Sequence, residues 1–268
     1  MADGLGTAMI TGASSGIGAV YADRLAKRGY DLVLVARDRS KMEALSSQLK
    51  HVGARIEVLV ADLTTPEDLD AVETRLAAGD ISLLVNNAGM SLNGSLLENG
   101  PEEISMIVGL NVAAPARLAA AAVKAFVAKG HGTVVNIASV LALAPERYDG
   151  IYSGSKSFLL NLSRSMTAHY ADLGVYTQAV LPGATRTKLW ERSGKDVDAL
   201  PIEMLMEVED LVDAAMVGFD QRETVTIPPL AGIAQWEAME EARLSMAPNL
   251  SRRAVAERYL STQSTESV

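Results

Sequence analysis

The chain contains no cysteine and only three histidines, so it has few of the residues that build metal or disulfide sites. Without cysteine, disulfides, thiolate catalysis and thiolate metal ligands are all excluded. The histidines, His51, His131 and His169, stand far apart and lack the spacing of metal ligands. We therefore expect no metal site and no catalytic histidine, and a reducing compartment fits this composition.

The chain also lacks a basic excess and a long hydrophobic run. It has 24 Lys and Arg against 33 Asp and Glu, a formal net charge of −9, which argues against a nucleic-acid partner. The start has no basic segment followed by an apolar one, so no secretory leader is expected. The apolar window TVVNIASVLALAP at 133–145 is too short to span a bilayer. These features predict a cytoplasmic protein without a membrane partner.

Short apolar runs rich in β-branched residues alternate with longer segments of helical periodicity. Strands are expected at residues 7–11, 31–36, 55–61, 81–86, 132–139, 175–182 and 224–228. Helices are expected at residues 17–28, 39–51, 66–78, 101–129, 151–173 and 207–218. Strands that are apolar on both faces belong to parallel sheets with helices on both sides. The pattern predicts an α/β fold, a doubly wound Rossmann sheet of seven parallel strands.

No repeat or linker divides the chain, so one domain is expected over residues 1–260. Within it, residues 184–206 have the position of a substrate lid, and residues 229–260 form a C-terminal helical extension. The polar tail 261–268 is expected to be disordered.

A glycine-rich stretch, TGASSGIG at 11–18, lies between the first predicted strand and the first helix. Gly12, Gly16 and Gly18 have no Cβ, so the backbone can turn sharply and approach a ligand closely. The free N–H groups at the start of the helix suit a pyrophosphate. In this position the loop predicts dinucleotide binding.

The second strand ends in VARDR, where many NAD-binding proteins carry an acidic residue for the ribose 2′-hydroxyl. Here Ala36 takes that place and Arg37 follows it. A guanidinium can bind a 2′-phosphate through charge-assisted hydrogen bonds, whereas a carboxylate would repel it. We therefore expect NADP(H) in preference to NAD(H), although Asp38 weighs against it. An ordinary solvated charge remains the alternative for Arg37.

Tyr152 and Lys156 stand four residues apart in a predicted helix and so share one face. Alone, the pair fits a packed tyrosine beside a solvated amine. Other stretches change that interpretation: ADL at 61–63, NNAG at 86–89, Asn111, Ser139 and PGATRT at 182–187. Together with the glycine-rich loop and Tyr-x-x-x-Lys, this ordered set resembles the short-chain dehydrogenase/reductase family over about residues 5–230.

The resemblance implies a role at each matching position. Ser139, Tyr152 and Lys156 would carry catalysis, and Asn111 would hold a water molecule that links Lys156 to solvent. Asp62 would contact the adenine, and Thr187 the pyrophosphate or carboxamide. Cofactor contacts are further implied, besides Gly12, Gly16, Gly18, Arg37, Tyr152 and Lys156, at Ser14, Ser15, Ile17, Leu63, Asn87, Ala88, Gly89, Pro182, Gly183 and Thr185.

The chemistry explains the choice of residues. Carbonyl reduction moves a hydride to carbon and a proton to oxygen, and a tyrosine of pKa about 10 can supply the proton. A nearby ammonium group favours the phenolate, so Lys156 is expected to lower the pKa of Tyr152. The hydroxyl of Ser139 would bind the substrate oxygen. The predicted function is interconversion of a carbonyl and an alcohol with NADP(H).

The substrate side is less determined. Apolar side chains in the lid could form a wall or simply pack against the body; they are Leu189, Trp190, Leu200, Ile202 and Met204. A fairly hydrophobic ketone or alcohol is expected, and Tyr148 could contact it. The Ala-rich faces of 101–129 and 151–173 suggest a homodimer or homotetramer. Two other functions stay open on the same fold: a cofactor-sensing regulator without turnover, and cofactor-assisted epimerisation or dehydration.

Overall fold

The computed structural model describes residues 5–94, 96–192, 194 and 196–260, so the predicted disordered tail 261–268 lies outside the described residues. The chain divides into two compact units, Met1–Pro229 and Leu230–Val268. The first unit carries the sheet and every predicted site residue. The second contains α9 (Ala234–Ser245), and none of its described residues is buried.

The first unit is built around one seven-stranded parallel sheet with strand order β3-β2-β1-β4-β5-β6-β7, which confirms the predicted fold. Its strands are β1 (Thr7–Thr11), β2 (Asp31–Ala36), β3 (Ile56–Val60), β4 (Ile81–Asn86), β5 (Gly132–Ile137), β6 (Val175–Val180) and β7 (Val225–Thr226). The chain order reverses at β1, which pairs with β2 on one side and β4 on the other. A ligand crevice is expected at the carboxyl ends of these strands.

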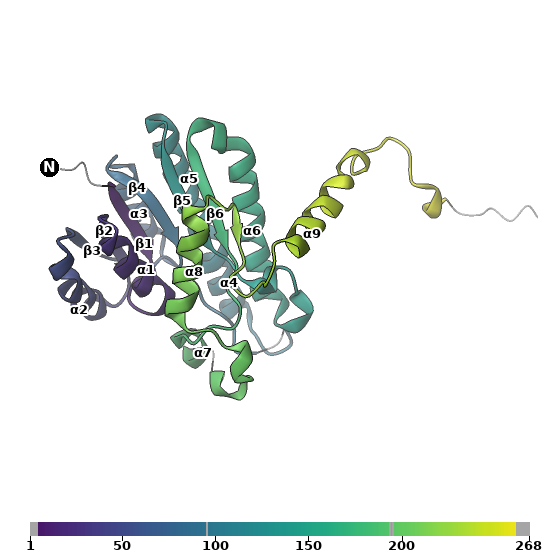
Figure 1. The fold of residues 1–268 in the computed structure, drawn as a ribbon. Coiled ribbons are helices and arrows are strands. Elements are labelled where there is room, and N and C mark those ends of the chain that lie inside the picture. The colour runs from purple at the N-terminus through teal and green to yellow at the C-terminus, as the bar shows by residue number, and fades with distance from the viewer. Residues whose placement is uncertain (1–4, 95, 193, 195, 261–268) are drawn as a thin grey trace, which may run out of the picture. The chain divides into compact units, whose positions relative to one another are not determined.

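Helices cover both faces of the sheet (Figure 1). They are α1 (Gly16–Lys27), α2 (Arg39–Leu49), α3 (Pro66–Ala77), α4 (Pro101–Val108), α5 (Ala114–Lys129), α6 (Gly150–Tyr170), α7 (Lys188–Arg192) and α8 (Val208–Asp220). Alternate side chains of β1 enter opposite cores, as the two-residue repeat of a strand requires. Ala8 and Ile10 pack with α1, α2 and α8, whereas Met9 packs with α3 and α5.

The predicted helix 101–129 is interrupted. A π-helical turn, Gly109–Ala113, separates α4 from α5. Among the described residues, this whole stretch, Pro101–Lys129, is long and apolar enough to cross a membrane by length and composition, although no such run was expected. Buried side chains of α5, including Leu118 and Phe126, join the core that also contains Met9. Packing within the fold thus explains part of the apolar composition of this stretch, in which 44% of an apolar 18-residue segment is buried.

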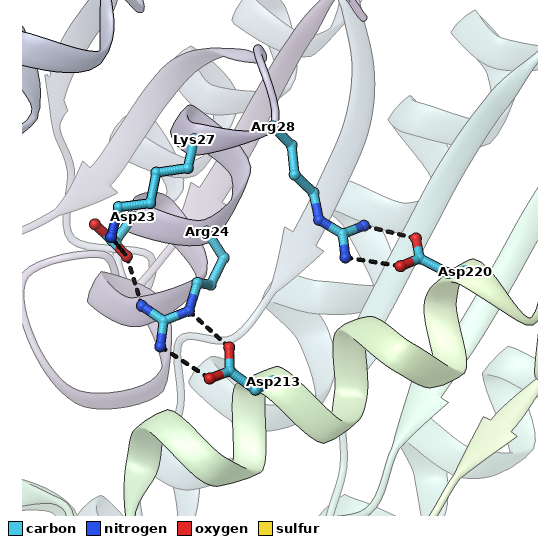
Figure 2. A network of polar contacts seen from close by, with 6 residues as sticks. All are labelled: Asp23, Arg24, Lys27, Arg28, Asp213 and Asp220. Atoms are coloured by element: carbon cyan, nitrogen blue, oxygen red, sulfur yellow. Dashed lines mark hydrogen bonds and ion pairs between the residues drawn. The ribbon is translucent and has the colours of Figure 1, made fainter.

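Arg24 of α1 and Arg28, the residue that directly follows the helix, connect α1 to α8 (Figure 2). Arg24 donates from Nε and Nη2 to the carboxylate of Asp213 at 2.6 and 3.0 Å. Arg28 donates in the same two-pronged way to Asp220 at 2.6 and 2.8 Å. Exposed ion pairs contribute about 1 kcal/mol or less each. Their main effect is to fix the orientation of α1, whose first residues carry the glycine-rich loop.

Candidate active site

The glycine-rich loop is held against the end of β4 by a buried threonine. Thr11 Oγ1 accepts hydrogen bonds from the backbone N–H groups of Asn87 and Ala88 at 2.9 and 3.0 Å. The Asn87 amide in turn donates to Thr11 O at 2.8 Å and Gly12 O at 3.3 Å. Gly12 has a φ of +67°, which disfavours other residues. These contacts set the loop's shape without using any of the N–H groups at the start of α1.

The first turn of α1 lies across from the segment that follows β6. A Cβ placed on Gly16 would be 3.6 Å from the side chain of Thr187. Gly16 and Thr187 also line one cleft together with Ser15 and Ile17. The N-terminus of α1 therefore faces this cleft with a hydroxyl opposite, which is an arrangement suited to a phosphate group.

A second cleft begins beyond Gly12, at the carboxyl ends of β2 and β3. Arg37 lines it, and its Nη1 lies 3.5 Å from Asp62 Oδ2. Burial alone would raise the pKa of Asp62, but hydrogen bonds from Thr64 and the charge of Arg37 together lower it. Asp38 is engaged elsewhere, since it caps α2 by accepting from Lys41 N and pairs with the Lys41 ammonium group. The negative charge of Asp38 is thus partly neutralised by Lys41, which lines the same cleft.

The side chains of Tyr152 and Ser139 meet at the end of β5. Tyr152 is buried on α6 and forms a hydrogen bond with the Ser139 hydroxyl. Its ring packs edge-on against Tyr148, with centroids 5.6 Å apart, and Tyr148 Oη lies 2.9 Å from Ser91 Oγ. Asp149 begins α6 by accepting from the N–H groups of Ile151 and Tyr152. This cap determines where the helix starts and hence where Tyr152 points.

Lys156 lies one turn further along α6 and is also buried. Its Nζ donates to Ile137 O at 2.9 Å and lies 5.7 Å from the centre of the Tyr152 ring. Burial lowers the pKa of Lys156 to about 8. Burial, with a smaller contribution from Tyr148, raises the pKa of Tyr152, and the Ser139 hydrogen bond only partly opposes this. The expected lowering of the tyrosine pKa by Lys156 is therefore wrong for this structure, because desolvation of the phenol outweighs it.

Asn111 lies in the π-helical turn and is fully engaged by its neighbours. Its Oδ1 accepts from Met90 N at 2.9 Å, and its Nδ2 donates to Met90 O at 2.8 Å and Ser155 Oγ at 3.1 Å. Ser155 Oγ donates to Tyr152 O at 2.7 Å. The amide thus joins the segment after β4 to the backbone that carries Tyr152. A π turn of this kind is frequent at functional sites.

The two clefts form one continuous groove, because Gly12, Ala88 and Gly89 line both. Their volumes are about 380 Å³ and 350 Å³. The larger contains Ser139, Tyr152 and Lys156, and the smaller contains Arg37 and Asp62. The other predicted residues that line the groove are Ser14, Ser15, Gly16, Ile17, Leu63, Asn87, Pro182, Gly183, Thr185 and Thr187. Two predicted residues do not line it: Gly18 and Asn111 lie behind its wall.

The segment after β6 closes the larger cleft. Trp190 Nε1 donates to Thr185 O at 2.8 Å, while Arg186 pairs with Asp198 and Glu207. Leu189, Trp190, Leu200 and Met204 line the cleft, so these four form the predicted apolar wall. Ile202 is different: its side chain is 76% exposed and lies outside the lining.

Some residues of the groove, and one behind it, were not predicted. Thr11 supports the loop without lining the groove, and it was missed because a buried strand-end threonine has no distinguishing neighbour in the sequence. Lys41 stands three positions after the capping residue Asp38. This spacing was a sequence signal from which its position near the second cleft could have been predicted. Ser91 and Arg147 occupy irregular segments, and no local pattern identified them.

The groove can hold an extended dinucleotide with phosphates at the glycine-rich loop. No Cβ fits at Gly18, where it would lie 2.5 Å from both Asn87 Nδ2 and Gly12 O. A Cβ at Gly89 would lie 3.6 Å from Lys156 Nζ. Gly18 thus lets the loop pack against Asn87 behind the groove, and Gly89 leaves room beside Lys156 inside it. Ser139, Tyr152 and Lys156 gather at one end of the groove.

Comparisons with known proteins agree with this geometry. A family model described as short chain dehydrogenase matches residues 6–198. The chain is 32% identical over 185 residues to human 17-beta-hydroxysteroid dehydrogenase type 3, a match that covers 68% of this chain and 60% of the human protein's length. Among solved structures, a short-chain dehydrogenase from Sphingobium yanoikuyae in complex with NADPH is 49% identical with a TM-score of 0.93.

The Sphingobium structure covers 96% of this chain and 100% of its own. A bulky-bulky ketone specific alcohol dehydrogenase from Comamonas testosteroni is 45% identical, with a TM-score of 0.89 and the same coverage. The family match over most of the first unit, the strand order and the residues gathered in the groove agree with one another. The chain belongs to the short-chain dehydrogenase/reductase family.

Proposed function

We propose that this protein is an NADPH-dependent oxidoreductase that interconverts a bulky, largely apolar ketone and its alcohol. The observation that carries the proposal is the joining of two clefts into one groove. The smaller cleft fits the adenine end of a dinucleotide, and the larger one contains the start of α1 together with Ser139, Tyr152, Lys156 and an apolar wall. The specificity of the Comamonas enzyme for bulky-bulky ketones supports the substrate class.

The cofactor would be held by the glycine-rich loop at its phosphates, by Asp62 at the adenine end and by Lys156 at the nicotinamide ribose. When bound, NADPH supplies a hydride for the carbonyl carbon. The protein's own residues orient the substrate and deliver the proton. The apolar wall excludes water from the reacting end, which strengthens the polar contacts made there.

Tyr152 donates its proton to the carbonyl oxygen, and Ser139 donates a hydrogen bond to the same atom as negative charge develops. The raised pKa of Tyr152 keeps the phenol protonated at neutral pH, the form that a reductase needs. Lys156, with a pKa near 8, is mostly an ammonium group at neutral pH. Its charge stabilises the phenolate that remains after proton transfer.

The preference for NADPH rests on the charges of the second cleft. Arg37 is 70% exposed at its side chain and lines this cleft with Lys41 and Ser14, so a guanidinium, a hydroxyl and the ammonium group that pairs with Asp38 are available to a 2′-phosphate. The binding of NADPH by the Sphingobium enzyme supports the same choice.

Turnover of a ketone panel tests the proposal directly. Diaryl and aryl-alkyl ketones should be reduced with NADPH at a higher kcat/KM than small ketones such as acetone, and more slowly with NADH. Consumption of cofactor is followed by absorbance and product formation by chromatography. A panel in which no carbonyl is reduced with either cofactor, by protein that binds NADPH, would contradict the assigned activity.

Replacing Arg37 by alanine tests the cofactor choice. The Arg37→Ala variant should lose about tenfold or more in affinity for NADPH, because one charge-assisted hydrogen bond contributes about 1.5–3 kcal/mol. Affinity for NADH should change less than about twofold. Titration of each cofactor by fluorescence gives both values, and Arg55→Ala, at an exposed pair outside the groove, is the matched control. Equal losses for the two cofactors would overturn the preference.

A further inference from the structure

The larger cleft carries positive charge and no negative charge. Among its lining residues are Arg147, Lys156 and Lys188, and none of the lining residues is an aspartate or a glutamate. The chain as a whole has the opposite balance, with a net charge of −9. A mostly apolar cleft whose charged lining residues are all cationic favours a ligand with an apolar body and one anionic group.

Two of the three cations lie where the proposed dinucleotide would bind. Lys156 is buried and bonded to Ile137 O. Lys188 is exposed and directly follows Thr187, whose side chain faces Gly16 of the glycine-rich loop. Arg147 is different because it precedes α6, on the wall that also holds Tyr148 and Leu141. It therefore belongs to the part of the cleft that the dinucleotide does not need.

Arg147 is also free of competing anions. Its side chain is exposed, and within the described ranges it forms no ion pair. The two acidic residues closest to it in sequence do not take its charge. Asp149 is committed to the N–H groups of Ile151 and Tyr152, and Glu146 does not line the cleft. An unpaired guanidinium at the opening of an apolar cleft is a ready contact for a carboxylate.

Resting on the proposed function, we propose that the substrate is a keto acid: a bulky apolar ketone with a carboxylate that binds Arg147 while the carbonyl contacts Ser139 and Tyr152. The fork of one guanidinium matches the two oxygens of a carboxylate, so Arg147 alone is enough to bind it. The tyrosine pair fixes the spacing, because the ring of Tyr148 packs edge-on against Tyr152 and Tyr148 directly follows Arg147.

The experiment compares keto acids with their uncharged esters. Benzoylpropionate, benzoylbutyrate and benzoylvalerate, each with its carboxylate at the chain end, are paired with their methyl esters, so that several distances from ketone to anion are sampled. With NADPH, at least one acid should exceed its ester about tenfold in kcat/KM, the effect of one charge-assisted contact. That preference should diminish as the concentration of KCl is raised.

Variants locate the effect. In Arg147→Met the ratio of acid to ester should fall below about two, and in Arg147→Lys it should lie between that value and the wild-type ratio. Lys124→Met removes an exposed cation of α5 outside the groove and should leave the ratio unchanged. Reduction of the esters with no preference for any acid, or a preference that survives Arg147→Met, overturns this inference alone. Failure to reduce acids and esters alike contradicts the proposed function instead.

Discussion

Changing Tyr152 to phenylalanine is expected to lower kcat for ketone reduction by roughly 10²–10⁴-fold, the usual contribution of a positioned general acid. The substitution removes only the hydroxyl that would protonate the substrate oxygen. The ring stays, so the packing against Tyr148 is retained and the dinucleotide groove keeps its shape. Steady-state reduction and NADPH titration, measured on the same preparation, separate the two effects, and binding of NADPH should stay within about threefold of wild type.

Tyr21 offers a matched control. It too is a buried tyrosine, but it belongs to the core that α1 shares with β1, and its hydroxyl finds no hydrogen-bond partner among the described residues. Tyr21→Phe should therefore keep full turnover. If Tyr152→Phe reduced ketones within tenfold of the wild-type rate, the proton would have to come from another group, and the assigned mechanism would fail.

Changing Gly18 to alanine should distort the glycine-rich loop and so weaken cofactor binding, although Gly18 does not line the groove. The added methyl group would meet Gly12 O and Asn87 Nδ2, both at 2.5 Å, and neither can retreat because the Asn87 amide is bonded to the loop. Overpacking of this kind costs about 1–3 kcal/mol of stability. The glycine-rich loop must shift to relieve it, so we expect a lower Tm and a loss of about tenfold or more in NADPH affinity.

Gly154 allows the same substitution where space is free. It lies exposed on α6 with nothing within 4 Å of an added Cβ. Gly154→Ala should raise the stability by about 0.5–1 kcal/mol, since alanine is the better helix former. Thermal unfolding gives the Tm of the Gly18→Ala and Gly154→Ala variants, and titration with NADPH gives their cofactor affinity. Wild-type NADPH affinity in Gly18→Ala would show that the loop tolerates the methyl group and that its packing does not set the cofactor site.

Much of this fold was predictable because the strands are apolar on both faces. The strands at 7–11, 31–36 and 81–86 were predicted with the bounds that the structure gives. The last strand was overestimated: only Val225–Thr226 pairs with β6, as Pro228 and Pro229 have no N–H to extend the ladder. The interruption of the helix at 101–129 was not predicted, since its apolar pattern continues through the π turn.

The site was predictable wherever a motif stands at the carboxyl end of a strand. Such ends meet at one edge of a parallel sheet, so Gly12, Asn87 and Ser139 were expected to converge. The path of an irregular segment depends on the whole fold, and for that reason Arg147 and Ser91 could not be placed. The pKa of Tyr152 was misjudged on similar grounds. Sequence spacing reveals a neighbouring charge, but the loss of water around a side chain is visible only after folding.

The π turn at Gly109–Ala113 gives this protein a helix with one residue more than a regular α-helix would need. Each helical residue advances by about 100° around the axis, so trimming the surplus residue would swing every later side chain of α5 by that angle. Leu118 and Phe126 would then leave the interior, and the amide of Asn111 would lose Met90. The packing of the core and the position of Asn111 beside Met90 thus both depend on the one extra residue of the π turn. A change in the length of this turn would disturb both.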